Sequence, residues 1–579
     1  MREDETGNLV VQIVSENSGL VLGLSPTYLF SLTSFTDLLS PDQECIIRGH
    51  ISFCRVDQQD PHDLDGPEVF LISGKSQDDR PDWTCWCAMH IAPGTELITL
   101  EFELETDHLF PLATPLDEQE LAGDGKAEVE HEPYQPTEHD LLESTQKKSK
   151  PLRLLHRPQH LMNSPMAHFS ILSQVNEQFA SATDINHLVK IVVGVLKEIT
   201  GFHRVMVYMV TLSLVLISNE KFDEHWNGQV VAELVDWNAT KDLYRGLHFP
   251  ATDIPAQARE LYTINKVRLL YDRDLPSARL VCRTQEDLQR PLDMTHSYLR
   301  AMSPIHIKYL GNMGVRASMS ISIVAFKELW GLISCHSYGQ RGMRVSFMLR
   351  KLCRLVGETV SRNIERLSLA QRLHARKLIK TSPTERNPGG YIVTRAEDLL
   401  SLFDADFGVL SIGDKGKILG PVENSQEVMA ALQYLRVKRF TTFQTSENIA
   451  RDYPGMAKLC KSFKMIAGLL LVPLSREGRD FIVFFRQGQL QQVHWAGNPY
   501  QNLENNEKGQ SLMPRKSFKI WSETVVGKCR HWTDEQLETA AVLHLVYGKF
   551  IEVWRQKEEA LQSTRMASLL LNNASHEGS

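Results

Sequence analysis

Hydrophobic and polar positions change their period several times along the chain, and each change indicates a new element. The segment NLVVQIVSEN (8–17) alternates apolar and polar residues as a half-buried strand does. WTCWCAMHI (83–91) and TELITLEFELE (95–105) are predicted to be later strands of the same small sheet. SPTYLFSLTSFTDLLS (25–40) is typical of short helices that begin at a Ser-Pro pair. Residues 1–114 are therefore predicted to form a first domain.

The next part of the chain, residues 115–152, lacks this periodicity. The run LDEQELAGDGKAEVEHEPYQPTEHDLLESTQKKSK is polar and acidic, and it contains few β-branched residues. Such a composition buries little apolar surface, so we predict a disordered acidic linker. Helical periodicity in FSILSQVNEQFASATDINHLVKIVVGVLKEIT and strand-like runs such as RVMVYMV, ASMSISIVAF and ELWGLISCHSY then predict a second domain over residues 153–345.

A long run of helical periodicity follows at residues 346–380. At ~1.5 Å per residue this helix would span roughly 50 Å, which is more than one domain needs. We therefore predict a spine helix that connects two domains. We also predict that it pairs with its copy in a homodimer, although the periodicity alone does not demonstrate this pairing. Residues 381–532 are predicted to be a third domain. Thr533, with Gln536 three residues later as a capping box, begins a C-terminal helix over 533–579.

Composition and charge narrow the class of protein. A chain of 579 residues can hold three or four domains, and 42% hydrophobic with 23% charged residues is ordinary for a soluble globular protein. The net charge of −8 argues against a general nucleic-acid binder. No run approaches the ~20 apolar residues of a membrane span, and the first residues lack the pattern of a signal peptide. We therefore expect a cytoplasmic protein without a membrane partner, with the nucleus as a second location.

The nine cysteines are scattered, and only Cys85 and Cys87 lie close together in the sequence. No second pair follows at the spacing that zinc sites use, so we expect no metal centre. Unpaired structural thiols are typical of a reducing compartment.

The most informative stretch is HFPATDIPAQARELYTINKVRLLYD, residues 248–272. Pro250 and Pro255 bracket Asp253, and proline removes backbone donors and stiffens the loop. A carboxylate held in a rigid loop before an amphipathic helix could bind one charged or hydrogen-bonding partner. It could equally complement the helix dipole, and local physics alone leaves both interpretations open.

This stretch resembles the P-A-S-D-I-P-A-Q-A-R signature of the GAF domain of phytochromes. LRAMSPIHIKYLGNMGVRASMSIS resembles the second signature of that domain, LWGLISCHSYG its third, and VSENSGLVLGL the phytochrome PAS domain. Two further motifs resemble those of the tongue of the PHY domain (about 486–520): Trp495, Ala496, Gly497 and Pro499, and Pro514, Arg515, Ser517 and Phe518. The acidic linker and FDEHWNGQVVAELVDW are most similar to the fungal phytochromes, which are hybrid histidine kinases.

The resemblance covers nearly the whole chain and implies an α+β fold. It implies tandem PAS (1–114), GAF (153–345) and PHY (381–532) domains, each an antiparallel sheet with flanking helices, joined by long spine helices. It further implies a red/far-red photoreceptor whose GAF domain binds a linear tetrapyrrole, or bilin. The fungal similarity favours biliverdin as that bilin.

The resemblance also implies the residues of the bilin site. Asp253 would contact the pyrrole nitrogens through its backbone and meet Arg515 of the tongue in one light state, and His306 would lie over those nitrogens. Arg268 and Arg300 would bind propionates, since guanidinium stays charged and binds carboxylate bidentately. Ser318 and Ser320 would offer hydroxyls to the second propionate, and His336 would bind the D-ring carbonyl. Ser517 would be a second contact from the tongue. The remaining residues of the implied pocket are Tyr208, Tyr262, Phe249, Ile254 and Met206. Taken singly, an aromatic or methionine residue on a strand is more often part of a hydrophobic core.

In the mechanism that the resemblance implies, light isomerises a double bond next to the D ring. The tongue then exchanges its partners at Asp253 and refolds, and the change travels along the spine helices to an output domain.

The chain departs from the family at the attachment cysteine. Plant-like members carry it immediately before the conserved histidine, where this chain has Ile305, and bacterial and fungal members carry it upstream of the PAS domain. The chain begins at Met1, after that segment, and Cys335 beside His336 is expected to be structural. We therefore expect a chain truncated at its N-terminus that has no covalent attachment site and binds its bilin noncovalently.

Two further departures concern an insertion and the C-terminus. VTLSLVLISNEK (210–221) interrupts a place where the family runs directly on, and we predict a retained intron, with a genuine loop as the alternative. LLLNNASHE resembles the start of a histidine-kinase phosphoacceptor helix, which makes His576 the candidate phosphoacceptor, with a frayed terminal residue as the alternative. We expect a fragment of a longer hybrid kinase that signals to a response regulator. Whether this chain is itself an enzyme stays open because it lacks the ATP-binding domain, and a scaffold that has lost its chromophore is a further alternative.

Overall fold

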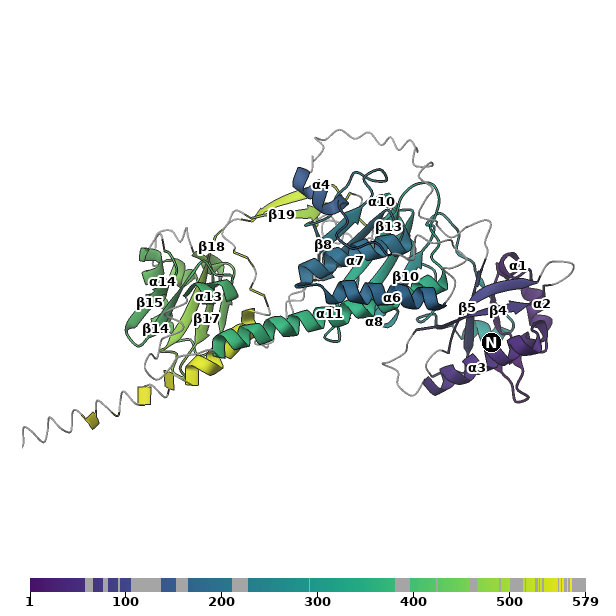
Figure 1. Cartoon of the computed structure of the whole chain (residues 1–579), viewed down its shortest axis with the longest axis horizontal. Coiled ribbons are helices and arrows are strands. Elements are labelled where there is room, and N and C mark those ends of the chain that lie inside the picture. Colours follow the sequence, from purple (N-terminus) through teal and green to yellow (C-terminus); the bar gives the residue numbers. More distant parts are fainter. Residues whose placement is uncertain are drawn as a thin grey trace, which may run out of the picture. The chain divides into compact units, whose positions relative to one another are not determined.

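The computed structural model places most of the chain, and Figure 1 shows its elements. It describes residues 1–57, 66–76, 82–91, 94–105, 137–152, 165–210, 228–290, 292–380, 396–422, 425–458, 466–488, 491–499, 514–515, 517–525, 529–530, 532–533, 536–549, 551–552, 555–556, 560 and 563–564. The chain divides into two compact units. The first comprises Met1–Leu212, His225–Glu365 and His494–Trp521, and the second comprises Ser213–Glu224, Arg366–Val493 and Ser522–Ser579.

The N-terminal part of the first unit is built on a three-stranded antiparallel sheet in the order β4-β5-β6. Its strands are β4 (Glu68–Gly74), β5 (Trp83–Ile91) and β6 (Ile98–Leu104). The smaller elements are β1 (Arg2–Glu3), β2 (Leu9–Val10), β3 (Ile13–Ser15), α1 (Ser18–Val21), α2 (Pro26–Ser31), the 3-10 helix η1 (Phe35–Leu38) and α3 (Pro41–Asp57). Ser25 starts α2, because its side chain accepts a hydrogen bond from the backbone N–H of Tyr28 at 3.2 Å and Pro26 follows it.

An eight-stranded sheet in the order β10-β12-β13-β7-β8-β9-β19-β20 lies mostly in the central part of the first unit, while residues 491–493 of β19 and 522–525 of β20 are counted with the second unit. Its strands are β7 (Arg204–Val210), β8 (Gly228–Val235), β9 (His248–Phe249), β10 (Val267–Leu270), β12 (Ala317–Ala325), β13 (Glu328–Ser337), β19 (Gln491–Ala496) and β20 (Ile520–Val525). A short strand, β11 (Leu280–Cys282), leaves this part and pairs antiparallel with β3 of the N-terminal part. Residues more than 250 positions apart in the chain are thereby held side by side.

Helices cover the apolar face of the central sheet (Figure 1). Asp184 starts α7 (Ile185–Thr200) by accepting a hydrogen bond from His187, and Gly201 ends it in the left-handed region at φ +73°. The long helix α11 (Phe347–Lys380) packs on β12, where Gly357 lies against Ile321. The other helices are α6 (Pro165–Ala180), the 3-10 helix η2 (Ala251–Asp253), α8 (Ala256–Ile264), α9 (Gln285–Gln289) and α10 (Pro304–Asn312).

Residues 137–152 are ordered, although they lie within the segment predicted to be a disordered acidic linker. They contain α4 (Glu138–Thr145), which Thr137 starts by accepting a hydrogen bond from Asp140. Glu143 accepts a hydrogen bond from Lys190 at 2.6 Å, and the backbone N–H of Leu152 donates to Glu198 at 2.6 Å. For residues 137–152 the prediction was wrong, because Glu143 and the backbone of Leu152 bind Lys190 and Glu198 of α7, which lie outside the segment.

The second unit is built on a five-stranded antiparallel sheet in the order β15-β14-β18-β17-β16. Its strands are β14 (Phe407–Ile412), β15 (Lys415–Leu419), β16 (Gln444–Ser446), β17 (Ile466–Pro473) and β18 (Phe481–Gln487), and its helices are α13 (Ala396–Leu402), α14 (Ser425–Lys438), α15 (Ile449–Asp452) and α16 (Pro454–Ala457). β17 and β18 are buried along almost their whole length, because one hydrophobic core packs against each face of the sheet and both strands contribute side chains to both cores. Residues 536–549 are also helical.

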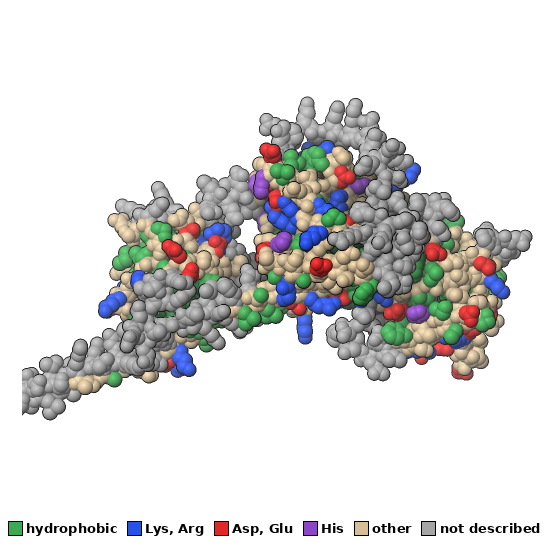
Figure 2. Space-filling view, viewed as in Figure 1, with side chains coloured by type: hydrophobic (Ala, Val, Ile, Leu, Met, Phe, Trp, Pro, Cys, Tyr) green, Lys and Arg blue, Asp and Glu red, His purple; other side chains and the backbone are tan. Residues whose placement is uncertain are grey.

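The predicted α+β class, with antiparallel sheets and flanking helices, is confirmed. The boundaries of the domains stay predictions. Within the described part of the chain, no helix combines the length and apolar character needed to cross a bilayer. Figure 2 shows acidic, basic and apolar side chains interspersed over the visible face. Residues 211–221 of the predicted insertion and the candidate phosphoacceptor His576 lie outside the described residues.

Candidate functional site

The register of the central sheet gathers polar residues from three strands on one face. Arg268 of β10 pairs with Ser320 of β12, and Ser318 of β12 pairs with His336 of β13. Directly paired residues point to the same side of a sheet, and so do residues two positions apart on one strand. These four side chains therefore share a face, and Met206 of β7 shares it through its pairing with Ser334. The opposite face carries Ile321 and the other residues that pack on the helices.

Arg268 contributes a buried cation with an unused donor to this face. Its side chain is 6% exposed, and Nη2 donates a hydrogen bond to the backbone carbonyl of Ala301 at 2.8 Å. Its Nη1 is buried and has no hydrogen-bond partner among the described residues. Burial and, after it, the charge of Arg300 lower the pKa of Arg268 to about 10, so it remains a cation at neutral pH. A buried N–H of this kind fits a carboxylate ligand.

His336 contributes a buried neutral imidazole. Its Nδ1 is buried and has no hydrogen-bond partner within the described ranges. Burial, followed by the charges of Arg204 and His306, lowers the pKa of His336 to about 3. A neutral imidazole with one unused ring nitrogen fits a ligand that offers a polar group at this end of the sheet. Arg268 and His336 together fit an elongated ligand that carries both carboxylates and polar ring atoms, as a bilin does.

His306 lies close enough to Arg268 and His336 to influence both, and its ring stacks on Tyr309, which binds the carboxylate of Asp253. Ser303 starts α10 by accepting a hydrogen bond from the backbone N–H of His306 at 3.4 Å, which places the imidazole in the first turn. The ring stacks on Tyr309, with centroids 6.0 Å apart and planes 12° apart. Burial and, after it, the charge of Arg268 lower the pKa of His306 to about 4. His306 is therefore neutral at physiological pH, as His336 is.

Asp253 forms a buried ion pair with Arg515, a residue 262 positions further along the chain. Arg515 Nε donates to Asp253 Oδ1 at 2.9 Å, Arg515 Nη2 donates to Asp253 Oδ2, and the hydroxyl of Tyr309 donates to Oδ2 at 3.0 Å. The Arg515 side chain has no exposed surface and that of Asp253 is 6% exposed. The contact is therefore a two-point, charge-assisted link, here called the latch, between Asp253 of η2 and Arg515.

The backbone around Arg515 is shaped to hold its guanidinium. Arg515 Nη1 donates to the carbonyl of Ala496, and Asn312 Nδ2 donates to the carbonyl of Arg515 at 2.8 Å. Gly497 adopts φ +82°, and a Cβ there would lie 2.1 Å from the carbonyl oxygen of Ser517. Glycine is required at this position by both the left-handed backbone and the close approach of the Ser517 carbonyl.

The two members of the ion pair have raised pKa values. Burial raises the pKa of Asp253 above its ordinary value of 3.8, while Arg515 and Tyr309 act against this rise. For Arg515, burial acts to lower the pKa, but the carboxylate of Asp253 outweighs it and raises the pKa above the ordinary value. The paired state is charged, since each group stabilises the ionised form of the other.

The other residues suggested by the sequence lie in three places. Tyr208, Phe249 and Met206 belong to one buried cluster with Ala496 and Phe518, and Ile254 packs against it. The rings of Tyr208 and Phe249 are 6.1 Å apart and nearly perpendicular. Tyr262 lies instead on α8, where its hydroxyl influences Arg268 and Arg300. Ser517 is exposed, and its hydroxyl accepts a hydrogen bond from the backbone N–H of Lys519 at 3.4 Å.

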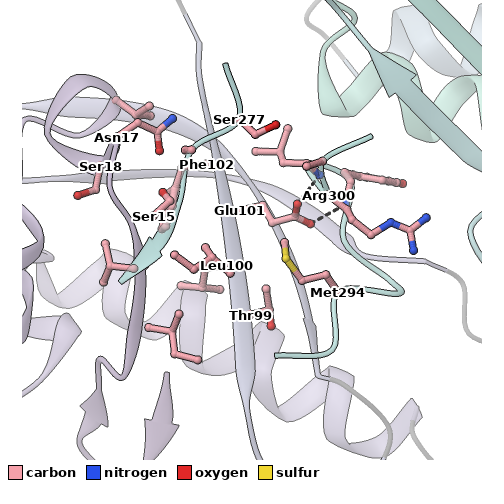
Figure 3. A pocket seen from close by; sticks show the side chains of 18 of the residues that line it. Ser15, Asn17, Ser18, Thr99, Leu100, Glu101, Phe102, Ser277, Met294 and Arg300 are labelled. Carbon is pink, nitrogen blue, oxygen red and sulfur yellow. Dashed lines mark hydrogen bonds between the residues drawn. The ribbon is translucent and has the colours of Figure 1, made fainter. Parts of the chain in front are cut away.

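A cavity of about 550 Å³ lies between the N-terminal and central parts of the first unit (Figure 3). Arg300 lines it, together with Glu101, Leu269 and Ile307. Ile305 occupies the position before His306, and its side chain is exposed. Cys335 is fully buried, and burial raises its thiol pKa well above the ordinary value, as suits a structural thiol.

Sequence reasoning missed three residues of this region. Tyr309 binds Asp253, and its position three residues after His306 on one helix face was the available signal. Asn312, which binds the carbonyl of Arg515, lies three residues further along that same face. Glu101 left no signal, because it alternates with apolar residues as any half-buried strand residue does. Among the described residues, no group of three or more His, Cys, Asp or Glu could hold a metal ion.

Two family models and several known proteins are similar to this chain. Residues 184–366 match the GAF domain family, and residues 371–557 match the family described as the phytochrome region, PHY. Cyanobacterial phytochrome B of Nostoc sp. is 30% identical over 413 residues, which cover 69% of this chain and 52% of that protein. A bacteriophytochrome of Xanthomonas campestris is 31% identical over 367 residues, which cover 61% and 55% of the two chains.

The comparison of structures extends over almost the whole chain. The phytochrome photosensory core module of Stigmatella aurantiaca superposes with a TM-score of 0.65 at 27% identity, covering 96% of this chain and 94% of that one. The chain spans about half the length of the curated relatives it matches.

Proposed function

Because this chain carries the GAF domain, the PHY region and the fold of a phytochrome photosensory module, we propose that it is a red/far-red photoreceptor that binds a bilin. The observation that carries the proposal is one sheet face. It presents a buried arginine with an unused donor and a buried neutral histidine. In the same unit, Arg515 of a distant segment binds Asp253.

We propose the following roles for the residues of the site. Arg268 and Arg300 bind propionates as charged, planar donors, and the hydroxyls of Ser318 and Ser320 add donors from the same face. His336 would bind a ring carbonyl and His306 would bind the ring nitrogens, where the tautomer of its neutral imidazole decides whether it donates or accepts a hydrogen bond. Tyr208, Phe249, Tyr262, Met206 and Ile254 exclude water around the ring system. A bound bilin supplies light absorption and isomerisation of a double bond.

The ion pair between Asp253 and Arg515 is proposed to be the element that light biases. Both partners are buried, so neither can separate without another partner for its charge, and the arrangement therefore favours two discrete states over a graded one. Release of Arg515 would free the segment that contains Ser517, and α11 would carry the change along its 34 residues. This coupling is a proposal about the chain's own contacts.

The finer assignments rest on the same site. Biliverdin is the proposed bilin, and binding is proposed to be noncovalent, since Ile305 stands before His306 and Cys335 is buried. In the whole protein, which we propose to be a cytoplasmic homodimer, the output is proposed to be a histidine kinase acting on a response regulator.

The proposal is tested by mixing the purified chain with biliverdin and recording its absorbance before and after red and far-red illumination. We expect a red absorption band that illumination converts reversibly. The variant Arg268→Met should bind biliverdin at least about tenfold more weakly, because it loses a charge-assisted hydrogen bond of about 1.5–3 kcal/mol. A chain that folds but shows no red band at saturating biliverdin would overturn the proposal.

A further inference from the structure

Glu101 of β6 contacts the loop that carries Arg300, although the two come from different parts of the first unit. Its Oε1 accepts a hydrogen bond from the backbone N–H of Tyr298 at 2.8 Å, and its Oε2 accepts one from Leu299 at 2.6 Å. Figure 3 shows the carboxylate reaching this loop beside Arg300 at the edge of the cavity. Glu101 is 6% exposed, so these two backbone donors have replaced water around it.

The loop is also held from the opposite side. Asn265 Nδ2 donates to the carbonyl of Ser297 at 3.2 Å, and Arg268 Nη2 donates to the carbonyl of Ala301 at 2.8 Å. Side chains of the central part thus bind carbonyls of the loop, while Glu101 binds its N–H groups. The backbone on both sides of Arg300 is thereby fixed at successive points.

Charged and titratable groups face Glu101 from every element packed against it. They are Arg350 of α11, Arg268 of β10, Tyr298 of the loop and Cys87 of β5. Burial raises the pKa of Glu101 to about 7, against the effect of the two backbone N–H groups and the two arginines. Both protonation states are therefore populated near neutral pH. A carboxylate accepts at both oxygens as a charged group, whereas a carboxylic acid makes only neutral hydrogen bonds, which are about half as strong.

We propose that Glu101 is a positioning residue for the bilin: its ionised carboxylate fixes loop 297–301 and thereby presents Arg300 to a carboxylate of the ligand. This inference rests on the proposed function. It assigns to the N-terminal part of the chain a direct influence on which ligands the central part binds. Ligands with carboxylates gain from the fixed loop, and ligands without them do not.

The test compares the affinity of the wild-type chain for biliverdin with its affinity for biliverdin dimethyl ester, from about pH 5.5 to about pH 8.5. Both ligands share the same ring nitrogens, so the ratio of the two affinities cancels the titration of the ring system. The preference for the diacid should rise about fivefold as pH increases through about 7, because Glu101 ionises there. This pH series needs no substitution, so it does not depend on whether a variant folds.

Glu101→Gln should abolish this rise, and Glu103→Gln is its matched control. Glu103 lies two residues along the same strand and is 7% exposed, but it accepts a hydrogen bond from the backbone N–H of Phe347 at the start of α11, at 2.8 Å, and not from the loop. It also pairs with Arg344 at 3.6 Å and with Arg350 at 3.8 Å, so the control removes a neighbouring buried carboxylate that shares Arg350 with Glu101 but does not bind the loop. Hydrogen–deuterium exchange without bilin should quicken around residues 298–299 in Glu101→Gln and stay unchanged there in Glu103→Gln. This measurement reports on the loop whether or not a ligand binds.

The possible outcomes separate the inference from the proposed function. A wild-type chain that binds neither ligand overturns both the proposed function and the inference. A red absorption band on mixing with biliverdin shows that the chain binds it and so excludes this outcome. A wild-type chain that binds biliverdin with a preference that is flat or falls with rising pH overturns the inference alone. Glu101→Gln that keeps the wild-type rise in preference also overturns the inference alone.

Discussion

Two buried arginines of the first unit differ in whether the chain supplies a carboxylate to pair with them. Arg515 binds the carboxylate of Asp253 at two points, and its pKa lies above the ordinary value. Arg268 is almost as buried, but Nη1 has no hydrogen-bond partner among the described residues and its pKa falls to about 10. One arginine is satisfied by the chain itself, and the other is not.

The difference supports the proposal that the region around Arg268 binds a ligand. Removing one partner of a buried pair is costly because the other charge is left behind, whereas removing a cation that lacks a partner costs little. The contact of Arg515 is therefore interpreted as a structural latch, and the surroundings of Arg268 as a binding site. Three substitutions test this contrast, in order of decreasing effect.

Asp253→Ala should have the largest effect, because it leaves Arg515 buried without its carboxylate. The free energy of local opening of segments 494–499 and 517–521 should fall by ~3–5 kcal/mol, as measured by hydrogen–deuterium exchange. The matched control is Glu96→Ala, which breaks the exposed pair of Arg2 and Glu96, whose side chains are 52% and 75% exposed. That control should cost less than ~1 kcal/mol. If both variants lowered the free energy of local opening equally, the buried pair of Asp253 and Arg515 would be no more stabilising than the exposed pair of Arg2 and Glu96.

Gly497→Ala should have the second largest effect, because it disturbs the backbone that holds Arg515 without touching either charge. Its control is Gly246→Ala, since Gly246 has φ +81° against +82° for Gly497, but a Cβ at Gly246 would enter open space with no neighbouring atom within 4 Å. The control should lose about 1–2 kcal/mol from the left-handed backbone alone. Gly497→Ala should lose about 1–3 kcal/mol more, because its Cβ meets the carbonyl of Ser517. Thermal unfolding of both variants measures the difference, and a difference of zero would contradict the proposed close approach.

Arg268→Met should have the smallest effect on the stability of the bilin-free chain, less than about 1 kcal/mol. Only the hydrogen bond to Ala301 is lost, while the buried cation is removed. Arg204→Met is the control, because Arg204 is paired with Glu233 at 3.0 Å and both side chains are fully buried. It should destabilise the chain by ~3–5 kcal/mol in the same chemical denaturation experiment. Strong destabilisation by Arg268→Met would mean that the chain itself satisfies this arginine.

Several features could be predicted from the sequence, for identifiable reasons. The alternation of apolar and polar residues in ASMSISIVAF and the helical period of α11 follow from local geometry, and both support the α+β class. The start of α2 at Ser25-Pro26 was also visible, because capping uses side chains next to the backbone groups they bind. The ordered segment 137–152 was not, since its stabilising partners lie on α7.

The sequence by itself determined which residues are candidates for the proposed bilin site: an aspartate between two prolines, two histidines, several arginines, and a glycine-containing motif far along the chain. Only the tertiary structure decided that Arg515 reaches Asp253 across 262 positions, that strand register places Arg268, Ser318 and His336 on one face, and that Glu101 binds the arginine loop. The physical reason is that hydrogen bonds and burial act over a few ångströms, while sequence patterns report only on neighbours along the chain. In the sequence, Glu101 alternates with apolar residues as other strand residues do. Only its contact with the loop of another part of the fold distinguishes it from them.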